Sequence, residues 1–281
     1  MNIGIVGLGL MGGSIASALK ERHNVFGYDI KETSMSYALS RGFVTRVFAN
    51  PPEMFELSDV LYLCLYPRDC VRFLREWQDL IKAGTVVIEI SGIKSLLIES
   101  TSPFLSSDYD LVFTHPVAGR EKSGVEFSDM NIFSGQKYLI VPTASNQEKN
   151  LVLVEKLAKE MGFGFVGRLG AEDHDDIIAY TSQLAHVLAL ALVDSDDGVF
   201  ATGHYIGDSY RDLTRIAMIN DTLWSELMIE NKDHLLKKID ALQASLSAYR
   251  DLIASGNYSR LAEKMRKAKS IRQSIDEDDK S

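Results

Sequence analysis

Short apolar runs alternate with helix-length segments through the first 167 residues of the chain. Each run is almost continuously hydrophobic, which is typical of strands that are covered on both faces. Strands that alternate with helices in this way predict βαβ units, and therefore a doubly wound α/β domain with a mainly parallel sheet. The expected strands are residues 3–6, 25–29, 60–65, 85–90, 111–114, 138–141 and 164–166.

The segments between these runs have helical periodicity. In residues 69–81, for example, Val71, Leu74 and Trp77 recur at helical spacing and form one apolar stripe. From about residue 172 the strand signals stop, and helical periodicity continues to about residue 274. We therefore expect two domains, an α/β domain over residues 1–168 and an all-α domain over residues 169–281.

Apolar residues of the second domain recur at alternating spacings of four and three. This spacing predicts a seam along which two helices pack, either within one chain or between two copies. We favour a homodimer that forms through the C-terminal helices. The seam residues are Leu235, Ile239, Leu242, Leu246, Tyr249 and Ile253.

The net charge of -9 would repel the phosphates of a nucleic acid, so we expect no nucleic-acid partner. The two cysteines, Cys64 and Cys70, are expected to be unpaired, and Cys64 lies in an apolar run. The N-terminal residues do not resemble a secretory signal, which favours a cytoplasmic protein. The apolar stretch 177–193 contains Gln183 and His186, so we expect a buried helix there and no membrane span.

The strongest local motif is GLGLMG at residues 7–12, which directly follows the first strand and precedes a helix. Its glycines have separate tasks in a dinucleotide-binding site. Gly7 allows a tight turn, Gly9 lets the backbone approach a pyrophosphate, and Gly12 lets helix and strand pack closely. The helix N-terminus then faces the phosphate charge. The motif indicates a Rossmann domain.

The second strand ends at Asp29, about 20 residues after the glycine motif. This carboxylate can accept hydrogen bonds from ribose hydroxyls and would repel a 2′-phosphate, so NAD is favoured over NADP as the cofactor. Ligands of such sheets bind beyond the C-terminal ends of the strands. The predicted cofactor-binding residues are Gly7, Gly9, Leu10, Met11, Gly12, Asp29, Leu65, Tyr66, Pro67 and Ser91.

Residues 115–124 concentrate charged groups at a strand end, where a substrate would meet the nicotinamide. They include His115, Glu121 and two basic side chains. Oxidation of an alcohol requires a base that takes the hydroxyl proton, and imidazole titrates near neutral pH. His115 is therefore the candidate base. No group of histidine, cysteine and acidic residues has metal-ligand spacing, so we expect no metal.

These residues resemble the prephenate and arogenate dehydrogenase family. Residues 115–124 resemble the family's HPxxGxExSG loop, and His174-Asp175 followed by residues 182–186 resembles its HD…SxLPH segment. RDLTRIA at residues 211–217, with Trp224 downstream, resembles its RDxTRIA segment. With the glycine motif, four motifs occur in the family's order over about residues 3–231.

The resemblance implies NAD-dependent oxidative decarboxylation in tyrosine biosynthesis, which converts prephenate to 4-hydroxyphenylpyruvate, CO2 and NADH. It implies that His115 draws the proton of the substrate hydroxyl and that Arg215 binds a carboxylate as a planar fork. By the same resemblance Ser91 and Lys94 belong to the catalytic set, with Lys94 adding positive charge near the substrate. The implied substrate-binding residues are Arg215, His186, Gln183, Trp224 and Glu121.

The chain departs from the family pattern at Gly92, where a serine is usual, and the hydroxyl is shifted to Ser91. Whether Ser91 replaces that serine is left open. Arg120 stands where threonine is common, so feedback inhibition by tyrosine is not carried over. Prephenate, arogenate and a 4-amino analogue of prephenate all remain candidate substrates.

Structural interpretations of the same side chains also remain. His115 could cap a strand end, and His186 and Trp224 could be core residues. Arg215 could pair with an acid, and Lys94 and Glu121 could be solvated loop charges. Two other functions fit the glycine motif: another NAD-dependent hydroxy-acid dehydrogenase of similar architecture, and a non-catalytic NAD-sensing protein.

Overall fold

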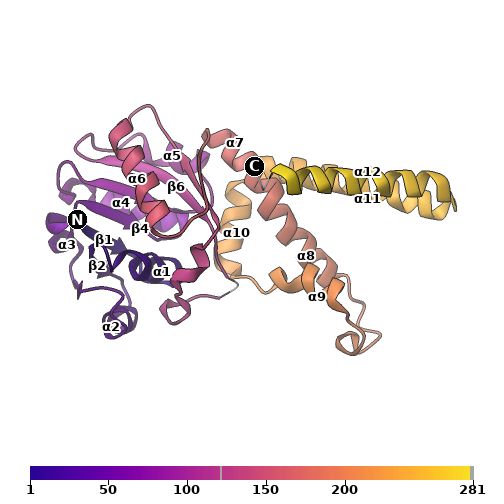
Figure 1. Cartoon of the computed structure of the whole chain (residues 1–281), viewed down its shortest axis with the longest axis horizontal. Coiled ribbons are helices and arrows are strands. Elements are labelled where there is room, and N and C mark those ends of the chain that lie inside the picture. The colour runs from indigo at the N-terminus through magenta and orange to yellow at the C-terminus, as the bar shows by residue number, and fades with distance from the viewer. Residues whose placement is uncertain (121, 279–281) are drawn as a thin grey trace. The chain divides into compact units, whose positions relative to one another are not determined.

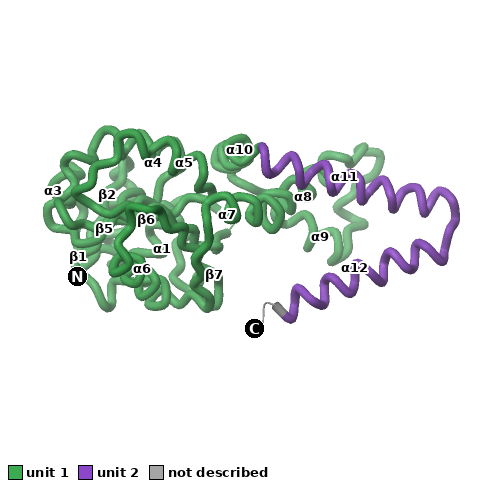
Figure 2. Tube along the Cα trace, turned by 90° about the horizontal axis from the view of Figure 1, so that it is seen from above, with its two compact units in different colours: residues 1–232 green, residues 233–281 purple. Residues whose placement is uncertain are grey.

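The computed structural model describes residues 1–120 and 122–278. They form two compact units, residues 1–232 and residues 233–281 as far as they are described, which are coloured separately in Figure 2. The expected domain boundary after residue 168 falls inside the first unit and stays a prediction.

The first unit is built on one eight-stranded sheet in the order β3-β2-β1-β4-β5-β6-β7-β8. All pairs are parallel except β6 with β7. The first six strands thus have the strand order of a Rossmann fold, which confirms the predicted fold class. The strands are β1 Asn2–Val6, β2 Asn24–Tyr28, β3 Arg46–Val47, β4 Val60–Leu63, β5 Val86–Glu89, β6 Asp110–Val117, β7 Lys137–Val141 and β8 Phe165–Arg168.

Helices cover both faces of this sheet (Figure 1), which is why the strands are hydrophobic throughout. In β4, Val60 and Tyr62 pack into one buried cluster, and Leu61 and Leu63 pack into another. The first cluster includes side chains of α1 Leu10–Leu19, α2 Glu32–Ser40 and α6 Glu148–Glu160. The second includes side chains of α3 Pro51–Leu57, α4 Pro67–Trp77 and α5 Ser95–Thr101.

Strand β6 is longer than the expected run 111–114. It continues to Val117 because β7 pairs with it, and His115 lies opposite Leu139. The apolar run ends at Thr114, and a proline is uncommon inside a paired strand. Here β5 pairs with β6 only as far as Phe113. On the β5 side, Pro116 therefore faces no strand that would need a hydrogen bond from its missing N–H. His115 is therefore a strand residue.

The helical part of the first unit begins with one continuous helix, Ala171–Asp194. It consists of α7 Ala171–Ile178, the π-helical turn η4 Ala179–Gln183, and α8 Leu184–Asp194. It is long and apolar enough to cross a membrane by length and composition, and the single chain buries 28% of its apolar stretch. It also carries the buried polar side chains of His174, Asp175 and Gln183. The predicted buried helix is thus only partly covered within one chain.

Three shorter helical segments complete the first unit: α9 Asp208–Thr214, η6 Arg215–Ala217 and α10 Asp221–Glu230. Short 3-10 turns elsewhere in the chain are η1 Gln78–Leu80, η2 Val125–Phe127, η3 Met130–Phe133 and η5 Thr202–His204.

The second unit consists of most of α11 Lys232–Ala254 together with α12 Tyr258–Asp278, joined by a tight turn (Figure 2). The predicted seam lies on a single long helix. In one chain the seam residues Leu246 and Ile253 are more than half exposed, as is Met265 on α12. The apolar ridge of these helices is therefore open in the single chain.

Candidate active site

The glycine motif has the geometry that a dinucleotide requires. Gly7 has a φ of 91°, and a Cβ there would lie 2.5 Å from the carbonyl oxygen of Cys64. A Cβ at Gly12 would lie 1.9 Å from the carbonyl oxygen of Gly7, so only glycine fits where helix α1 meets the sheet. By contrast, nothing lies within 4 Å of a Cβ placed at Gly9. The backbone is open there to the approach of a phosphate.

Asp29, just past the end of β2, is fixed by the backbone around it. Its Oδ2 accepts a hydrogen bond from the N–H of Leu8 at 2.7 Å, and its Oδ1 accepts one from the N–H of Lys31 at 2.8 Å. Each carboxylate oxygen can accept further hydrogen bonds. Asp29 therefore stands beside the glycine motif with a fixed negative charge, as an adenosine ribose requires.

A cavity of about 730 Å³ opens next to the glycine motif. Its volume suits a small organic ligand together with part of a cofactor. One wall is made by the ends of strands and their loops, and the other by η4, α8 and α10. Of the predicted site residues, those that line it are Gly9, Leu10, Met11, Gly12, Leu65, Tyr66, Ser91, His115, Gln183, His186 and Trp224.

His115 stands on this wall at the end of a chain of hydrogen bonds. Its Nδ1 lies 3.0 Å from Nε2 of His174, and Nδ1 of His174 lies 2.8 Å from Oδ1 of Asp175. Burial, followed by the neighbouring His174 and Lys94, holds the pKa of His115 well below its ordinary value of 6.5. The imidazole is therefore neutral at neutral pH and can act as a base.

Lys94 is not among the residues that line the cavity. Its side chain is completely buried, and Nζ donates to Glu89 Oε2 at 2.5 Å and to the carbonyl oxygen of Ser91 at 2.8 Å. A buried ammonium needs such a partner because it has left water. The expected role of Lys94 as a charge beside the substrate is thus not what the structure displays, since Glu89 neutralises it.

Ser91 lines the cavity, but its hydroxyl points into the protein. Oγ donates to the carbonyl oxygen of Ile93 at 3.3 Å and lies 3.5 Å from Nζ of Lys94. The position that faces His115 is Gly92, where a Cβ would lie 3.7 Å from Nε2 of His115. In the described part of the chain, Ser91 therefore makes no hydrogen bond to His115.

His186 and Trp224 form the aromatic side of the cavity. Their ring centroids are 3.7 Å apart and their planes are inclined by 32°. Nδ1 of His186 donates to the carbonyl oxygen of Ser182 at 2.9 Å. Gln183 is buried, donates to the carbonyl oxygen of Leu227 and accepts from Asn231. The amide nitrogen and oxygen of Gln183 thus both make contacts that hold α10 and the residue after it against η4.

The structure does not place Arg215 among the residues that line the cavity, although the next residue, Ile216, does line it. Arg215 is exposed at the start of η6. Glu121, the other predicted charge, lies outside the described residues. Two further basic side chains that line the cavity are Arg120 and Lys122.

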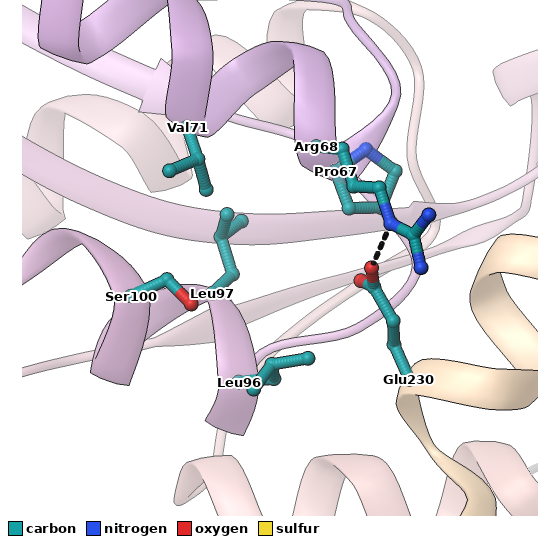
Figure 3. Close-up of a pocket in the computed structure, with 7 residues that line it drawn as sticks. All are labelled: Pro67, Arg68, Val71, Leu96, Leu97, Ser100 and Glu230. Atoms are coloured by element: carbon teal, nitrogen blue, oxygen red, sulfur yellow. Dashed lines mark hydrogen bonds and ion pairs between the residues drawn. The ribbon is translucent and has the colours of Figure 1, made fainter.

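Helix α10, which carries Trp224, and its N-cap residue Asn220 are tied to the first turn of α4 and to the loop that precedes it. The N–H of Arg68 donates to Glu226 Oε1 at 2.6 Å, and Nδ2 of Asn220 donates to the hydroxyl of Tyr66 at 2.7 Å. Figure 3 shows the neighbouring ion pair of Arg68 with Glu230, at the rim of a second and smaller hollow. These contacts fix the aromatic wall relative to the predicted cofactor loop.

Comparison with known proteins agrees with this geometry. The family model described as "Prephenate dehydrogenase, nucleotide-binding domain" matches residues 15–166, and the model described as "Prephenate dehydrogenase, dimerization domain" matches residues 170–267. The chain belongs to the prephenate dehydrogenase family. The family resemblance and the nucleotide-binding N-terminal domain expected from the sequence are thereby confirmed.

Individual members of the prephenate dehydrogenase family match along nearly the whole chain. A cyclohexadienyl dehydrogenase of Zymomonas mobilis is 27% identical over 99% of this chain and 97% of its own length. A prephenate dehydrogenase of Bacillus subtilis is 25% identical over 96% of this chain and 75% of its own. The structure of prephenate dehydrogenase from A. aeolicus, in complex with hydroxyphenyl propionate and NAD+, has a TM-score of 0.88 at 29% identity and covers 98% of both chains.

Sequence reasoning assigned no role to Glu89, His174 or Asp175, although His174 and Asp175 belong to one of the motifs shared with the prephenate dehydrogenase family. A signal for Glu89 was present, because it is an acid inside the apolar run 85–90, five residues before Lys94. Within residues 1–120 and 122–278 no group of three histidine, cysteine or acidic side chains could hold a metal ion.

Proposed function

We propose that this member of the prephenate dehydrogenase family catalyses the NAD-dependent oxidative decarboxylation of prephenate to 4-hydroxyphenylpyruvate and CO2, in tyrosine biosynthesis. The observation that carries the proposal is the position of His115, whose neutral imidazole lines the cavity that the glycine motif also lines. NAD is the cofactor, and when bound it accepts the hydride that leaves the ring carbon of the substrate. Gly7, Gly9, Gly12 and Asp29 are the residues that would hold it.

His115 manages the proton of the substrate. As the carbon–hydrogen electron pair leaves, the hydroxyl oxygen becomes a carbonyl oxygen and its proton passes to Nε2 of His115. Loss of CO2 then returns an electron pair to the ring, which becomes aromatic with a negative oxygen. The proton on His115 moves back to that oxygen, so the base is regenerated and the atoms balance.

Cations and aromatic rings would hold the substrate. Prephenate is a dianion, and we propose that Arg215, which directly precedes the cavity residue Ile216, binds one carboxylate as a bidentate fork. We assign the ring of the substrate to the aromatic side formed by His186 and Trp224, with Gln183 behind it. Glu121 is proposed at the mouth of the pocket from its motif alone.

Prephenate is our first choice of substrate, and arogenate and the 4-amino analogue remain alternatives for the same cavity. Prephenate and arogenate differ only in a keto or an amino group on the side chain. Among the relatives, those of B. subtilis and A. aeolicus are named prephenate dehydrogenases and that of Z. mobilis is named a cyclohexadienyl dehydrogenase. All three names favour a cyclohexadienyl substrate, and two of the three specify prephenate.

The test follows NADH formation by the purified chain with prephenate, arogenate and a 3-hydroxy acid, each with NAD and with NADP. We expect NADH and an equal amount of CO2 from prephenate, and about 100-fold or more slower turnover in the His115→Asn variant. Turnover of arogenate alone would change the substrate. NAD binding without any turnover would overturn the proposal in favour of an NAD-sensing protein, and turnover of the 3-hydroxy acid alone would favour a different dehydrogenase.

We further propose that the chain is a cytoplasmic homodimer that forms through its C-terminal helices. The matching dimerization-domain description and the exposed apolar residues Leu246, Ile253 and Met265 support it. Burial of such side chains is the usual driving force for subunit association. Light scattering on the purified chain should give twice the 31.3 kDa mass of one chain. Replacing Leu246 and Ile253 by glutamate should yield monomers.

A further inference from the structure

We propose that His174, held by Asp175, is a positioning residue that keeps His115 in the one tautomer whose bare nitrogen faces the cavity. The hydrogen-bond chain described above joins His115, His174 and Asp175. Its two ends differ, because the carboxylate can only accept hydrogen bonds and an imidazole can donate one. The inference about the tautomer stands on these contacts together with the charge states of Asp175 and the two rings. Its consequence for turnover rests on the proposed function.

The chain starts from a group that can only accept. Oδ1 of Asp175 accepts the N–H of Lys94 at 2.9 Å, and Oδ2 accepts the N–H of Ser95 at 2.7 Å. Although burial opposes it, hydrogen bonds from His174 and Ser95 keep the pKa of Asp175 below its ordinary value. The side chain is thus a carboxylate without a proton. Nδ1 of His174 must then carry the hydrogen that joins it to Asp175.

The tautomer of the first imidazole fixes that of the second. Burial lowers the pKa of His174, although its hydrogen bond to Asp175 opposes the shift, so the ring is neutral at neutral pH. A neutral ring with hydrogen on Nδ1 has a bare Nε2, which can only accept. Nδ1 of His115 must therefore donate to it. His115 in turn is left with a bare Nε2, which is the nitrogen that lies beside Gly92 at the cavity.

Charges on the surrounding elements support this direction. The groups that face the two rings are Asp175 on α7, Glu89 on β5 and Lys94 at the start of α5. Lys94 and Glu89 neutralise each other, which leaves the carboxylate of Asp175 behind His174. When His115 accepts a proton on Nε2, this carboxylate can stabilise the resulting cation through His174. The arrangement works as the aspartate of a hydrolase triad does, with one imidazole inserted.

Among the described residues, His174 is the hydrogen-bond partner of the His115 ring. Within residues 1–120 and 122–278, Nε2 of His115 has no hydrogen-bond partner, and Gly92 beside it has no side chain to supply one. The hydroxyl of Ser91 is directed to Ile93. His174 itself is fully buried and does not line the cavity, so it acts on a substrate only through His115.

The test replaces His174 by leucine and by glutamine. With leucine, the buried Nδ1–H of His115 would lose its acceptor, so the proton should move to Nε2, where cavity water can accept it. Glutamine restores a carbonyl oxygen as an acceptor. We expect turnover to fall roughly 100-fold to 10,000-fold with leucine and to recover at least about tenfold with glutamine, at nearly unchanged KM. Asp173→Asn, an exposed charge on the same helix, is the matched control and should keep full turnover.

Nitrogen NMR of the protein with ¹⁵N-labelled histidine supplies a readout that needs no turnover. The unsubstituted chain should show a bare Nε2 and a protonated Nδ1 for His115, and the His174→Leu variant should show the reverse. A purely structural role would leave the tautomer unchanged, and that result, or a protonated Nε2 in the unsubstituted chain, would overturn the inference. If the chain turns over no cyclohexadienyl substrate, the proposed function fails while the NMR result still decides the tautomer.

Discussion

Glu89 and Lys94 form a completely buried ion pair, in which Nζ of Lys94 lies 2.5 Å from Oε2 of Glu89. Glu89 also accepts a short hydrogen bond from the N–H of Ser91. Both members of the pair thus bond to the backbone of Ser91 and hold the loop after β5 in place. Gly92 is the next residue of that loop. Because a buried charge without a partner is costly, the two residues should behave as a unit.

Lys94→Met should consequently destabilise the fold by about 3 to 5 kcal/mol, since it leaves the Glu89 carboxylate unpaired inside the protein. The double variant Glu89→Leu, Lys94→Met should recover most of this loss, because no charge remains buried. Urea unfolding of both variants measures the difference. A loss below about 1 kcal/mol in the single variant would contradict the assignment of a buried ion pair.

The buried histidines make stability depend on pH. The pKa of His115 is well below its ordinary value of 6.5 in the folded chain, and that of His174 is also lowered. As pH falls below about 6.5, the unfolded chain takes up protons first, so the free energy of unfolding should fall with it. Above that pH both states are neutral at these sites and the effect is absent.

Urea unfolding at about pH 7 and pH 5 measures this dependence. The His115→Gln, His174→Gln double variant should lose less stability between the two conditions than the unsubstituted chain. An equal loss in both proteins would place the acid sensitivity elsewhere in the chain.

Trp224 offers an optical signal for the cavity. The chain has two tryptophans, and only Trp224 lines the cavity, where it lies against His186. Binding of prephenate or of a hydroxyphenyl product should change its fluorescence, because the ligand would displace water from the indole ring. Trp224→Phe should remove the ligand-dependent change. Trp77→Phe, on α4, should preserve it, and the opposite pattern would place the ligand elsewhere.

Asp29 should control the choice between NAD and NADP. Asp29→Asn keeps a side-chain oxygen for the N–H of Leu8 but removes the charge that would repel a 2′-phosphate. The ratio of kcat/KM with NADP to that with NAD should therefore rise about tenfold. Glu32→Gln, a nearby exposed acid at the start of α2, is the control and should leave the ratio unchanged.

Most of the fold could be predicted from the sequence because its signals are local. The apolar runs gave seven of the strands, and the glycine motif follows β1 as expected. The strand β3 was not predicted, because its two residues, Arg46 and Val47, are too few to form a hydrophobic pattern. The C-terminal end of β6 was not predicted, because it depends on pairing with β7, which begins 20 residues further along the chain.

The candidate site was predictable residue by residue but not as an arrangement. His115 and His174 lie 59 positions apart, and only the packing of α7 beside β6 brings their rings together. Lys94 was expected to lie beside the substrate, because its burial depends on how the loop after β5 folds back to bring it to Glu89 at the end of that strand. The roles of these side chains depend on contacts between helices and strands, and a sequence motif does not contain those contacts.

The π-helical turn at Ala179–Gln183 determines which way the following helix faces. Ile178 and His186 both line the cavity, although they are eight positions apart. In an uninterrupted α-helix their directions would diverge by about 80°, whereas one extra residue in a wide turn reduces the divergence to about 20°. If the same residues formed a regular α-helix instead, with none deleted, His186 would turn away from the direction of Ile178 by about 80°. At this point an irregular backbone therefore preserves the aromatic wall.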